Sequence, residues 1–432
     1  MASDIAAMIA NVRKSTGTGI VSTVKELKEN QFGLPLRHYC QQYLFGSTGM
    51  RLRVFHSISG PPQSCKSPLL FDLMGHICAS KEEGGLGGLG YLYEMEDKIS
   101  PLMLQSVISR YGDNALDSVI PVEDMALDDA FTHIGTVLRP NYRKSCGECT
   151  VPLVIGLDSI GGAASQDIIK KMQTEGAVGK GYHEKAHYVK YFCENAGKAF
   201  GDIPVVVICI NQEKEAASST PYGPPQKTVT GGKSQIFKDG WMISSAYKTL
   251  ASGDGKLLTL RTTKTSFSDQ RKIEVGFRWN KYGNTDNPED TYGHHFDWAL
   301  ASAKCLADPE KGVGDIRDIC NVKVAESGLV TCETFGMRSV PAEEFEAALF
   351  DSANSKVLNA LYAYQKIERI KGMDEYVAYL KARKASEKAD KAEVKEEKPA
   401  KAAKKTAPAP AKRKPTPLTF PGDEPPAETE NG

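Results

Sequence analysis

The sequence predicts an α/β fold with a mostly parallel sheet, helices on its faces and a β-hairpin extension. Three apolar runs of strand length support this fold class: residues 52–58, 151–157 and 203–210. Helix-like stretches separate these runs, and buried strands alternating with helices are typical of a parallel sheet. Two further strand patterns, residues 257–264 and 273–279, predict the hairpin.

The segment after the first run reads Ser59-Gly-Pro-Pro-Gln-Ser-Cys-Lys-Ser67, and a helix-like run follows at residues 69–79. A strand, a tight loop ending in Lys-Ser and a helix form the layout of a P-loop. In that motif backbone N–H groups cradle a β-phosphate, the lysine reaches the β- and γ-phosphates, and the serine hydroxyl ligates Mg²⁺. Cys65 stands where the motif expects glycine, so a Cβ lies where the backbone must approach phosphate closely. The nucleotide-binding residues expected here are Gly60, Ser64, Cys65, Lys66 and Ser67.

Composition sets the limits of the prediction. The 432 residues are enough for one large domain with an appendage, or for two domains. Lys+Arg and Asp+Glu both number 54, so any basic surface must be local. No apolar run is long enough to cross a membrane and the N-terminus lacks the order of a secretory signal, so we expect a cytoplasmic protein with no membrane partner.

The ten cysteines lie mostly in apolar runs, which favours reduced core thiols over a disulfide framework. Cys146-Gly-Glu-Cys149 has the spacing of half a zinc site or of a redox pair. No second pair follows it, so a surface turn is the favoured interpretation.

Two strand ends carry acidic residues. Residues 91–96 form a strand pattern that ends in Glu94 and Glu96, on one face of a regular strand, where a base for water activation would be needed. A solvated strand end is the alternative. Asp158 closes the second apolar run, as a Walker-B carboxylate that organises Mg²⁺ would. The Gly-rich residues 84–90 precede a strand instead of following one, so we interpret them as a flexible loop.

The chain divides into four segments. Residues 1–33 predict short amphipathic helices that form an oligomerisation segment, and residues 34–283 form the core. Residues 284–383 predict a mainly helical region. Residues 384–432 are rich in Lys, Ala and Pro with an acidic end, which predicts a disordered tail. Its lysines could bind DNA weakly or only keep the tail soluble.

This order of parts resembles the ATPase core of the RecA recombinase superfamily, and most closely the bacteriophage UvsX-type recombinases. The resemblance covers residues 34–300 and includes a segment, Glu94-Met-Glu-Asp-Lys-Ile-Ser-Pro101, similar to the family's Asp-x-Glu-x-x-x-x-Pro. It implies that Glu96 is the catalytic glutamate and Asp158 the Walker-B aspartate. Gln212 matches the glutamine that senses the γ-phosphate. Arg261 and Lys264 match hairpin cations that contact ATP bound by the adjacent subunit.

The resemblance further implies a DNA-dependent ATPase that uses ATP and Mg²⁺. It would form helical homo-oligomeric filaments on single-stranded DNA and pair that strand with homologous duplex DNA. A single-stranded DNA-binding protein and a recombination mediator are further expected partners. Two loops, residues 163–181 and 213–233, offer glycines and lysines for phosphate contacts. The DNA-binding residues expected on them are Lys180, Tyr222, Lys227, Gly231 and Gly232.

Two alternatives stay open. A hexameric DNA helicase of the same fold would share the nucleotide motifs, although it usually carries a larger N-terminal domain. A DNA-binding filament or mediator that does not hydrolyse ATP is the second alternative, and Cys65 keeps it under consideration.

Overall fold

The computed structural model describes most of the chain between residues 29 and 397. The described residues are 8, 12, 23, 26, 29–96, 98–175, 187–192, 194, 199–216, 226–229, 239–265, 270–279, 293–307 and 316–397. Two units are distinguished, residues 22–382 and residues 1–21 with 383–432.

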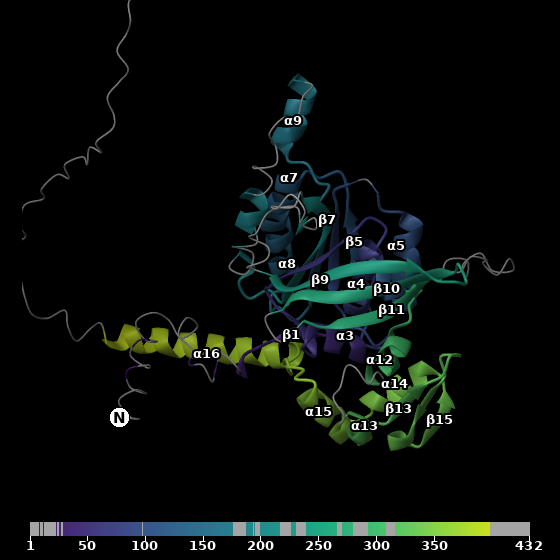
Figure 1. Ribbon diagram of the computed structural model, residues 1–432. Coiled ribbons are helices and arrows are strands. Elements are labelled where there is room, and N and C mark those ends of the chain that lie inside the picture. The colour runs from purple at the N-terminus through teal and green to yellow at the C-terminus, as the bar shows by residue number, and fades with distance from the viewer. Residues whose placement is uncertain are drawn as a thin grey trace, which may run out of the picture. The chain divides into compact units, whose positions relative to one another are not determined.

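A ten-stranded sheet forms the centre of the unit of residues 22–382 (Figure 1). Its main path runs β12-β11-β10-β9-β3-β7-β6-β4-β5, and β8 pairs with β7. The strands are β3 (Phe55–Gly60), β4 (Leu89–Glu94), β5 (Val119–Val122), β6 (Leu153–Asp158), β7 (Val205–Ala216), β8 (Gln226–Val229), β9 (Asp239–Thr249), β10 (Gly255–Thr265), β11 (Lys272–Arg278) and β12 (His295–Phe296).

The pairing divides this sheet into two parts. All neighbours from β9 through β3, β7, β6 and β4 to β5 are parallel. Strands β9, β10, β11 and β12 continue it as an antiparallel extension. The α/β class, the mostly parallel sheet and the hairpin extension predicted from the sequence are therefore confirmed.

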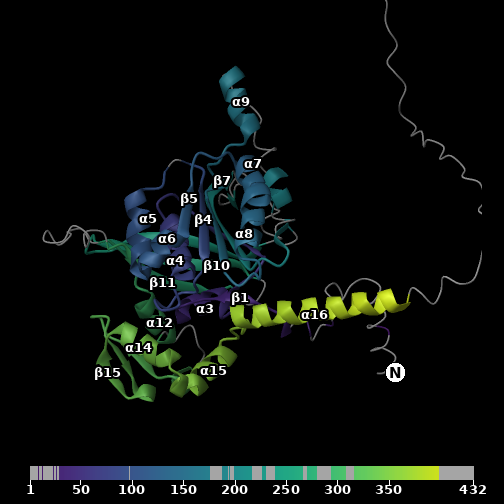
Figure 2. The ribbon, with the colours of Figure 1, turned by 180° about the vertical axis from the view of Figure 1, so that it is seen from behind.

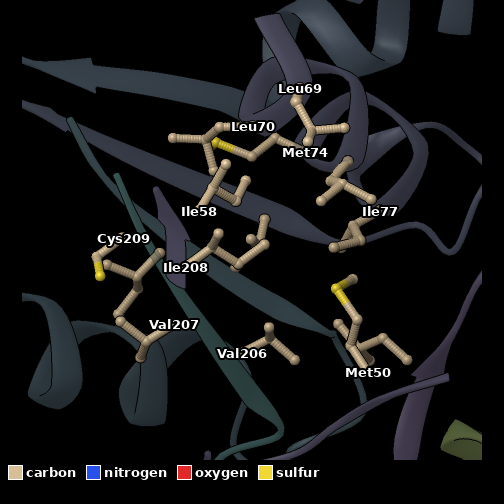
Figure 3. Close-up of a cluster of buried hydrophobic side chains, with 14 of the residues drawn as sticks. Met50, Ile58, Leu69, Leu70, Met74, Ile77, Val206, Val207, Ile208 and Cys209 are labelled. Carbon is tan, nitrogen blue, oxygen red and sulfur yellow. The ribbon is translucent and has the colours of Figure 1, made fainter. Parts of the chain in front are cut away.

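Helix α4 (Lys66–Cys78) covers one face of the parallel strands because it is apolar on nearly every side. Figure 3 shows its side chains Leu70 and Met74 over Ile58 of β3 and Ile208 of β7. All four side chains are fully buried. Gly156 of β6 leaves room for this contact, since a Cβ there would lie 3.0 Å from Met74 Sδ and 3.1 Å from Leu70 Cδ2. The packing fixes the start of α4 at the carboxyl end of β3.

Other helices surround the sheet (Figure 2). Side chains alternate along a strand, so Phe55 of β3 faces away from Ile58 and from α4. It meets Phe192 edge-on at 6.1 Å, and Phe192 stacks on Phe131 at 4.1 Å. Between residues 101 and 175 the chain forms the helices α5 (Pro101–Ile108), α6 (Asp113–Ser118), α7 (Leu127–His133), α8 (Arg139–Ser145) and α9 (Gln166–Glu175).

Several elements differ from the sequence prediction. Residues 121–134 have a helix-like pattern in the sequence, but they contain the end of β5 and α7, because Pro121 and Val122 pair with β4. The loop expected at 163–181 contains α9. The loop expected at 213–233 contains two paired strands, since β7 continues to Ala216 and pairs with β8.

A second hydrophobic core lies in the C-terminal region and includes Tyr39 of α3 (Tyr39–Phe45). The mainly helical prediction omitted a three-stranded sheet there. The elements of this region are α12 (Trp298–Ala307), α13 (Ile316–Ile319), β13 (Val322–Val324), β14 (Val330–Cys332), β15 (Met337–Val340), α14 (Ala342–Phe350), α15 (Ser355–Tyr364) and α16 (Met373–Glu397). A small sheet of β1 (Gly33–Pro35) and β2 (Gly49–Arg51) completes the fold.

Two buried carboxylates join these parts. Asp72 of α4 accepts hydrogen bonds from Tyr111 Oη and from Trp298 Nε1 of α12, both at 2.7 Å. Glu346 of α14 accepts one from the Tyr39 backbone N–H at 3.1 Å. These contacts tie α12 and α14 to the core.

Helix α16 continues to Glu397, so residues 384–397 differ from the disordered tail expected there. Alanine, lysine and glutamate dominate this stretch, and all three are strong helix formers. Residues 398–432 lie outside the described part, as do most of residues 1–28. No described helix is long and apolar enough to cross a membrane.

Candidate nucleotide site

Polar side chains meet where the parallel strands end. Strands β3, β7, β6 and β4 are consecutive neighbours in the sheet. In their register Gly60 pairs with Gln212, and Glu94 pairs with Asp158. Gln212, Glu94 and Asp158 line a cavity of about 440 Å³. Ligands of open α/β sheets bind at this edge.

The β3–α4 loop forms one wall of the cavity. Gly60 has φ 154°, and a Cβ there would lie 2.3 Å from Ser245 O, so this position requires glycine. Cys65, directly before α4, has φ 54° in the left-handed region. A residue with a Cβ is strained there. Burial raises the pKa of the Cys65 thiol to about 11, so it stays protonated at neutral pH.

Lys66 begins α4 and turns its side chain back over the loop. Its Nζ donates hydrogen bonds to Gly60 O at 3.1 Å and Pro61 O at 2.7 Å. The side chain is buried, which lowers its pKa, while the nearby carboxylates of Asp158 and Glu213 act in the opposite direction. The ammonium group therefore lies at the helix N-terminus, where anions are favoured.

Asp158 is a buried carboxylate of the cavity. Burial raises its pKa to about 6, although a hydrogen bond with the Ser67 hydroxyl favours the charged form. Its Oδ2 is buried and accepts no hydrogen bond from the described residues. A hard cation prefers oxygen ligands and would satisfy that oxygen. Asp158 and Ser67 therefore fit Mg²⁺ as two protein ligands, the others coming from water or phosphate. No group of three or more His, Cys, Asp or Glu among the described residues could hold a metal by itself.

Glu94 and Glu96 differ in role. Glu94 ends β4, and its Oε1 accepts hydrogen bonds from the backbone N–H groups of Glu96 at 2.9 Å and Lys98 at 3.3 Å. Glu94 therefore shapes the turn that follows the strand. Glu96 lies beyond the strand end and reaches across to β6, where its Oε1 accepts a hydrogen bond from Ser159 Oγ. The expectation that both acids lie on a regular strand is wrong, because β4 ends at Glu94.

Glu96 is also held from β7 and from its own loop. Gln212 Nε2 donates to Oε1 at 3.3 Å and to Oε2 at 3.4 Å. Lys98 Nζ lies 2.7 Å from Oε2. Burial opposes the charged form of Glu96, but the bonds from Lys98 and Ser159 outweigh it and lower its pKa. Glu96 is therefore a carboxylate at neutral pH.

The structure brings together the four residues predicted to be catalytic, Lys66, Glu96, Asp158 and Gln212, and all four line the cavity. Ser64, Cys65 and Ser67 line it as well. Arg261 is exposed on β10 and Lys264 lies near the end of that strand, and neither is among the described residues that line the cavity. Their predicted contact with an adjacent subunit stays a prediction.

The predicted DNA-binding residues fall largely beyond the described chain. Lys180, Tyr222, Gly231 and Gly232 lie outside the described residues. Lys227 belongs to β8, where it pairs with Glu215 of β7, and its side chain is outside the described part. The backbone N–H of Cys149 donates a hydrogen bond to the Cys146 carbonyl at 2.7 Å, which agrees with the turn predicted at Cys146–Cys149.

Sequence reasoning missed several residues of the cavity. Lys98 follows Glu96 by two positions, so its closeness to Glu96 in the sequence could have predicted their contact. Lys256, whose Nζ donates to Gln63 O at 2.6 Å, comes from the start of β10 and gave no local signal. The cavity is also lined by the apolar or aromatic side chains of Phe71, Ile99, Met103, Phe277, Trp279 and His294.

A search with models of known protein families and a search of curated proteins both find no match for this chain. The geometry of the cavity and the sequence motifs therefore carry the functional argument.

Proposed function

We propose that this protein is a P-loop ATPase of the RecA recombinase type, which binds ATP with Mg²⁺ and polymerises on single-stranded DNA for homologous pairing and strand exchange. The observation that carries the proposal is the meeting of Lys66, Asp158, Glu96 and Gln212 in one cavity. These residues lie far apart in the sequence, and the sequence motifs with the family resemblance imply a role in ATP hydrolysis for each.

The β3–α4 loop would hold the phosphates. Lys66 now donates to carbonyls of its own loop. An incoming phosphate is a stronger acceptor than a carbonyl, because the hydrogen bond gains charge on both sides. Lys66 would therefore turn from the loop to the β- and γ-phosphates, where it stabilises charge that spreads over the transferred group.

Asp158 and Ser67 would hold Mg²⁺. The ion supplies positive charge beside the phosphates. The protein keeps the Asp158 carboxylate buried, with Oδ2 unbonded to any described residue. The hydrogen bond with Ser67 and the pairing of Asp158 with Glu94 in the sheet hold this carboxylate in place. A cation at that oxygen favours the ionised form of Asp158 over the protonated one.

Glu96 is the candidate general base. Its lowered pKa keeps it ionised at neutral pH, and it borders the same cavity as Lys66. A carboxylate in this place orients a water and accepts its proton as the water attacks the γ-phosphate. Gln212 contacts Glu96 and stands at the point where β7 leaves the parallel sheet for the hairpin with β8.

That position of Gln212 offers a physical route between nucleotide and DNA. A γ-phosphate that attracts the Gln212 amide would also displace β7 beyond it, and so the β7–β8 hairpin in the predicted DNA-binding segment. Both ligands would then favour the same position of one element, which is the requirement for coupling.

Electron microscopy of the protein with single-stranded DNA tests the proposal. We expect helical filaments with ATP and Mg²⁺, and few or none without nucleotide. Lys66→Ala should abolish ATP hydrolysis in the same preparations. Closed rings would favour the helicase alternative, and equal DNA coating with and without ATP would favour the passive filament. Hydrolysis by Lys66→Ala at the wild-type rate would refute the nucleotide site.

A further inference from the structure

Lys98 makes a contact with Glu96 that differs from the other bonds of this carboxylate. The Lys98 side chain is 69% exposed, whereas that of Glu96 is 8% exposed. Ser159 and Gln212 approach Glu96 from the sheet strands β6 and β7. Lys98 approaches it from the loop after β4, with most of its surface in solvent. Among the described contacts of Glu96, the one with Lys98 is the easiest to break.

Together these contacts occupy both oxygens of Glu96. Oε1 accepts from Ser159 and Gln212, and Oε2 accepts from Lys98 and Gln212. A general base needs an oxygen lone pair that points at the water it activates. The observed arrangement therefore holds Glu96 in place but leaves it a poor base.

We propose that Lys98 is a positioning residue that restrains Glu96 in the absence of DNA, and that it leaves Glu96 for the nucleotide phosphates when ATP and single-stranded DNA are both bound. This inference rests on the proposed ATPase function. Lys98 lines the same cavity as Lys66 and Lys256, so its ammonium group is within the space that a polyanion would enter. Exposed ion pairs are weak, whereas an ammonium group gains more from a multiply charged phosphate.

The charges around Glu96 predict the direction of the effect. Asp158 and Glu94 are like charges that favour protonation of Glu96, and Lys66 is an opposite charge on α4. Lys98 supplies the largest stabilisation of the carboxylate after the burial that opposes it. Removal of Lys98 therefore leaves Glu96 less paired and more basic.

The test compares Lys98→Met, which keeps the aliphatic stem, with Lys98→Arg, which keeps the charge. The control is Lys356→Met, which removes an exposed lysine of α15 far from the cavity in the fold. Phosphate release is measured over about pH 5 to 9, without and with single-stranded DNA, together with the KM for ATP. Glu96→Gln, measured alongside, reports whether hydrolysis depends on this carboxylate.

For Lys98→Met we expect a several-fold higher kcat without DNA, a smaller stimulation by DNA and an acid limb of the pH–rate profile shifted to higher pH. Lys98→Arg and Lys356→Met should behave like wild type. An unchanged or lower kcat in Lys98→Met, while Glu96→Gln is inactive, would overturn the role of Lys98 alone. A raised KM with unchanged kcat would make Lys98 a substrate-binding cation and overturn the restraint. Absence of hydrolysis in the wild type would overturn both proposals.

Discussion

A substitution at Gly162 can displace the Glu96 carboxylate while Glu96 itself is kept. This glycine follows β6 and lies against the carboxylate, and a Cβ built on it would stand 2.1 Å from Glu96 Cδ and Oε1. Ordinary contacts begin near 3.4 Å, so Gly162→Ala must push the carboxylate aside by more than about 1 Å. A misplacement of about 1 Å costs on the order of 10²-fold in rate. We therefore expect ATP hydrolysis to fall about 10²-fold in Gly162→Ala.

The same geometry predicts little change in stability. The atoms that move are the end of a flexible side chain, and Gly162 is not among the residues with positive φ, so alanine fits its backbone. Replacing glycine at such a position changes the free energy of unfolding by less than about 1 kcal/mol. Gly135→Ala is the matched control, because a Cβ there meets nothing within 4 Å.

The assay is steady-state phosphate release with saturating ATP and single-stranded DNA, beside fluorescence titration of ATP and urea unfolding. Wild-type hydrolysis in Gly162→Ala would refute the placement of Glu96 at the reacting water. Loss of folding together with activity would refute the claim that only the carboxylate moves.

Three further predictions concern stability and are measured by urea unfolding. Leu70→Ala, in the contact between α4 and the sheet, should cost about 2–5 kcal/mol, whereas exposed Leu102→Ala should stay within about 0.5 kcal/mol; equal effects would contradict the core described here. Without divalent cations, the raised pKa of Asp158, about 6, makes the folded protein more stable at low pH than at high pH. This contribution to the free energy of unfolding is about 3 kcal/mol; it is fully present below about pH 4 and is lost as the pH rises through 6. Asp158→Asn should lack this slope, and a wild-type slope in the variant would exclude Asp158 as its source. Trp298→Phe removes a donor to buried Asp72 and should cost about 1–3 kcal/mol; an unchanged free energy of unfolding would contradict the role of this hydrogen bond.

Many residues of the site could be predicted from the sequence, because the end of a buried strand can be recognised as the end of an apolar run. Asp158 and Gln212 each close an apolar run, and parallel strands bring such ends to one edge of the sheet. The order of Gly60, Lys66 and the following helix is a local signal of the same kind. These residues needed no knowledge of which strands are neighbours.

The remainder depended on contacts between distant segments. Lys256 enters the cavity only because β10 lies beyond β9 in the sheet, which no local pattern specifies. Pro121 and Val122 begin a helix-like pattern in the sequence, yet they end β5 because they gain their strand pairing from β4. The small sheet of β13, β14 and β15 has strands of three or four residues, too short for a clear period of two.

Single-turnover phosphate release from ATP with Mg²⁺, with and without single-stranded DNA, tests the central claim most directly. We expect the wild type to release phosphate and single-stranded DNA to stimulate this release. In Glu96→Gln we expect a loss of about 10²-fold or more with ATP binding retained, because the amide keeps the shape of the carboxylate and lacks its basicity. Bound ATP that the wild type leaves intact, or equal release by Glu96→Gln, would contradict the assignment of this cavity as an ATPase site.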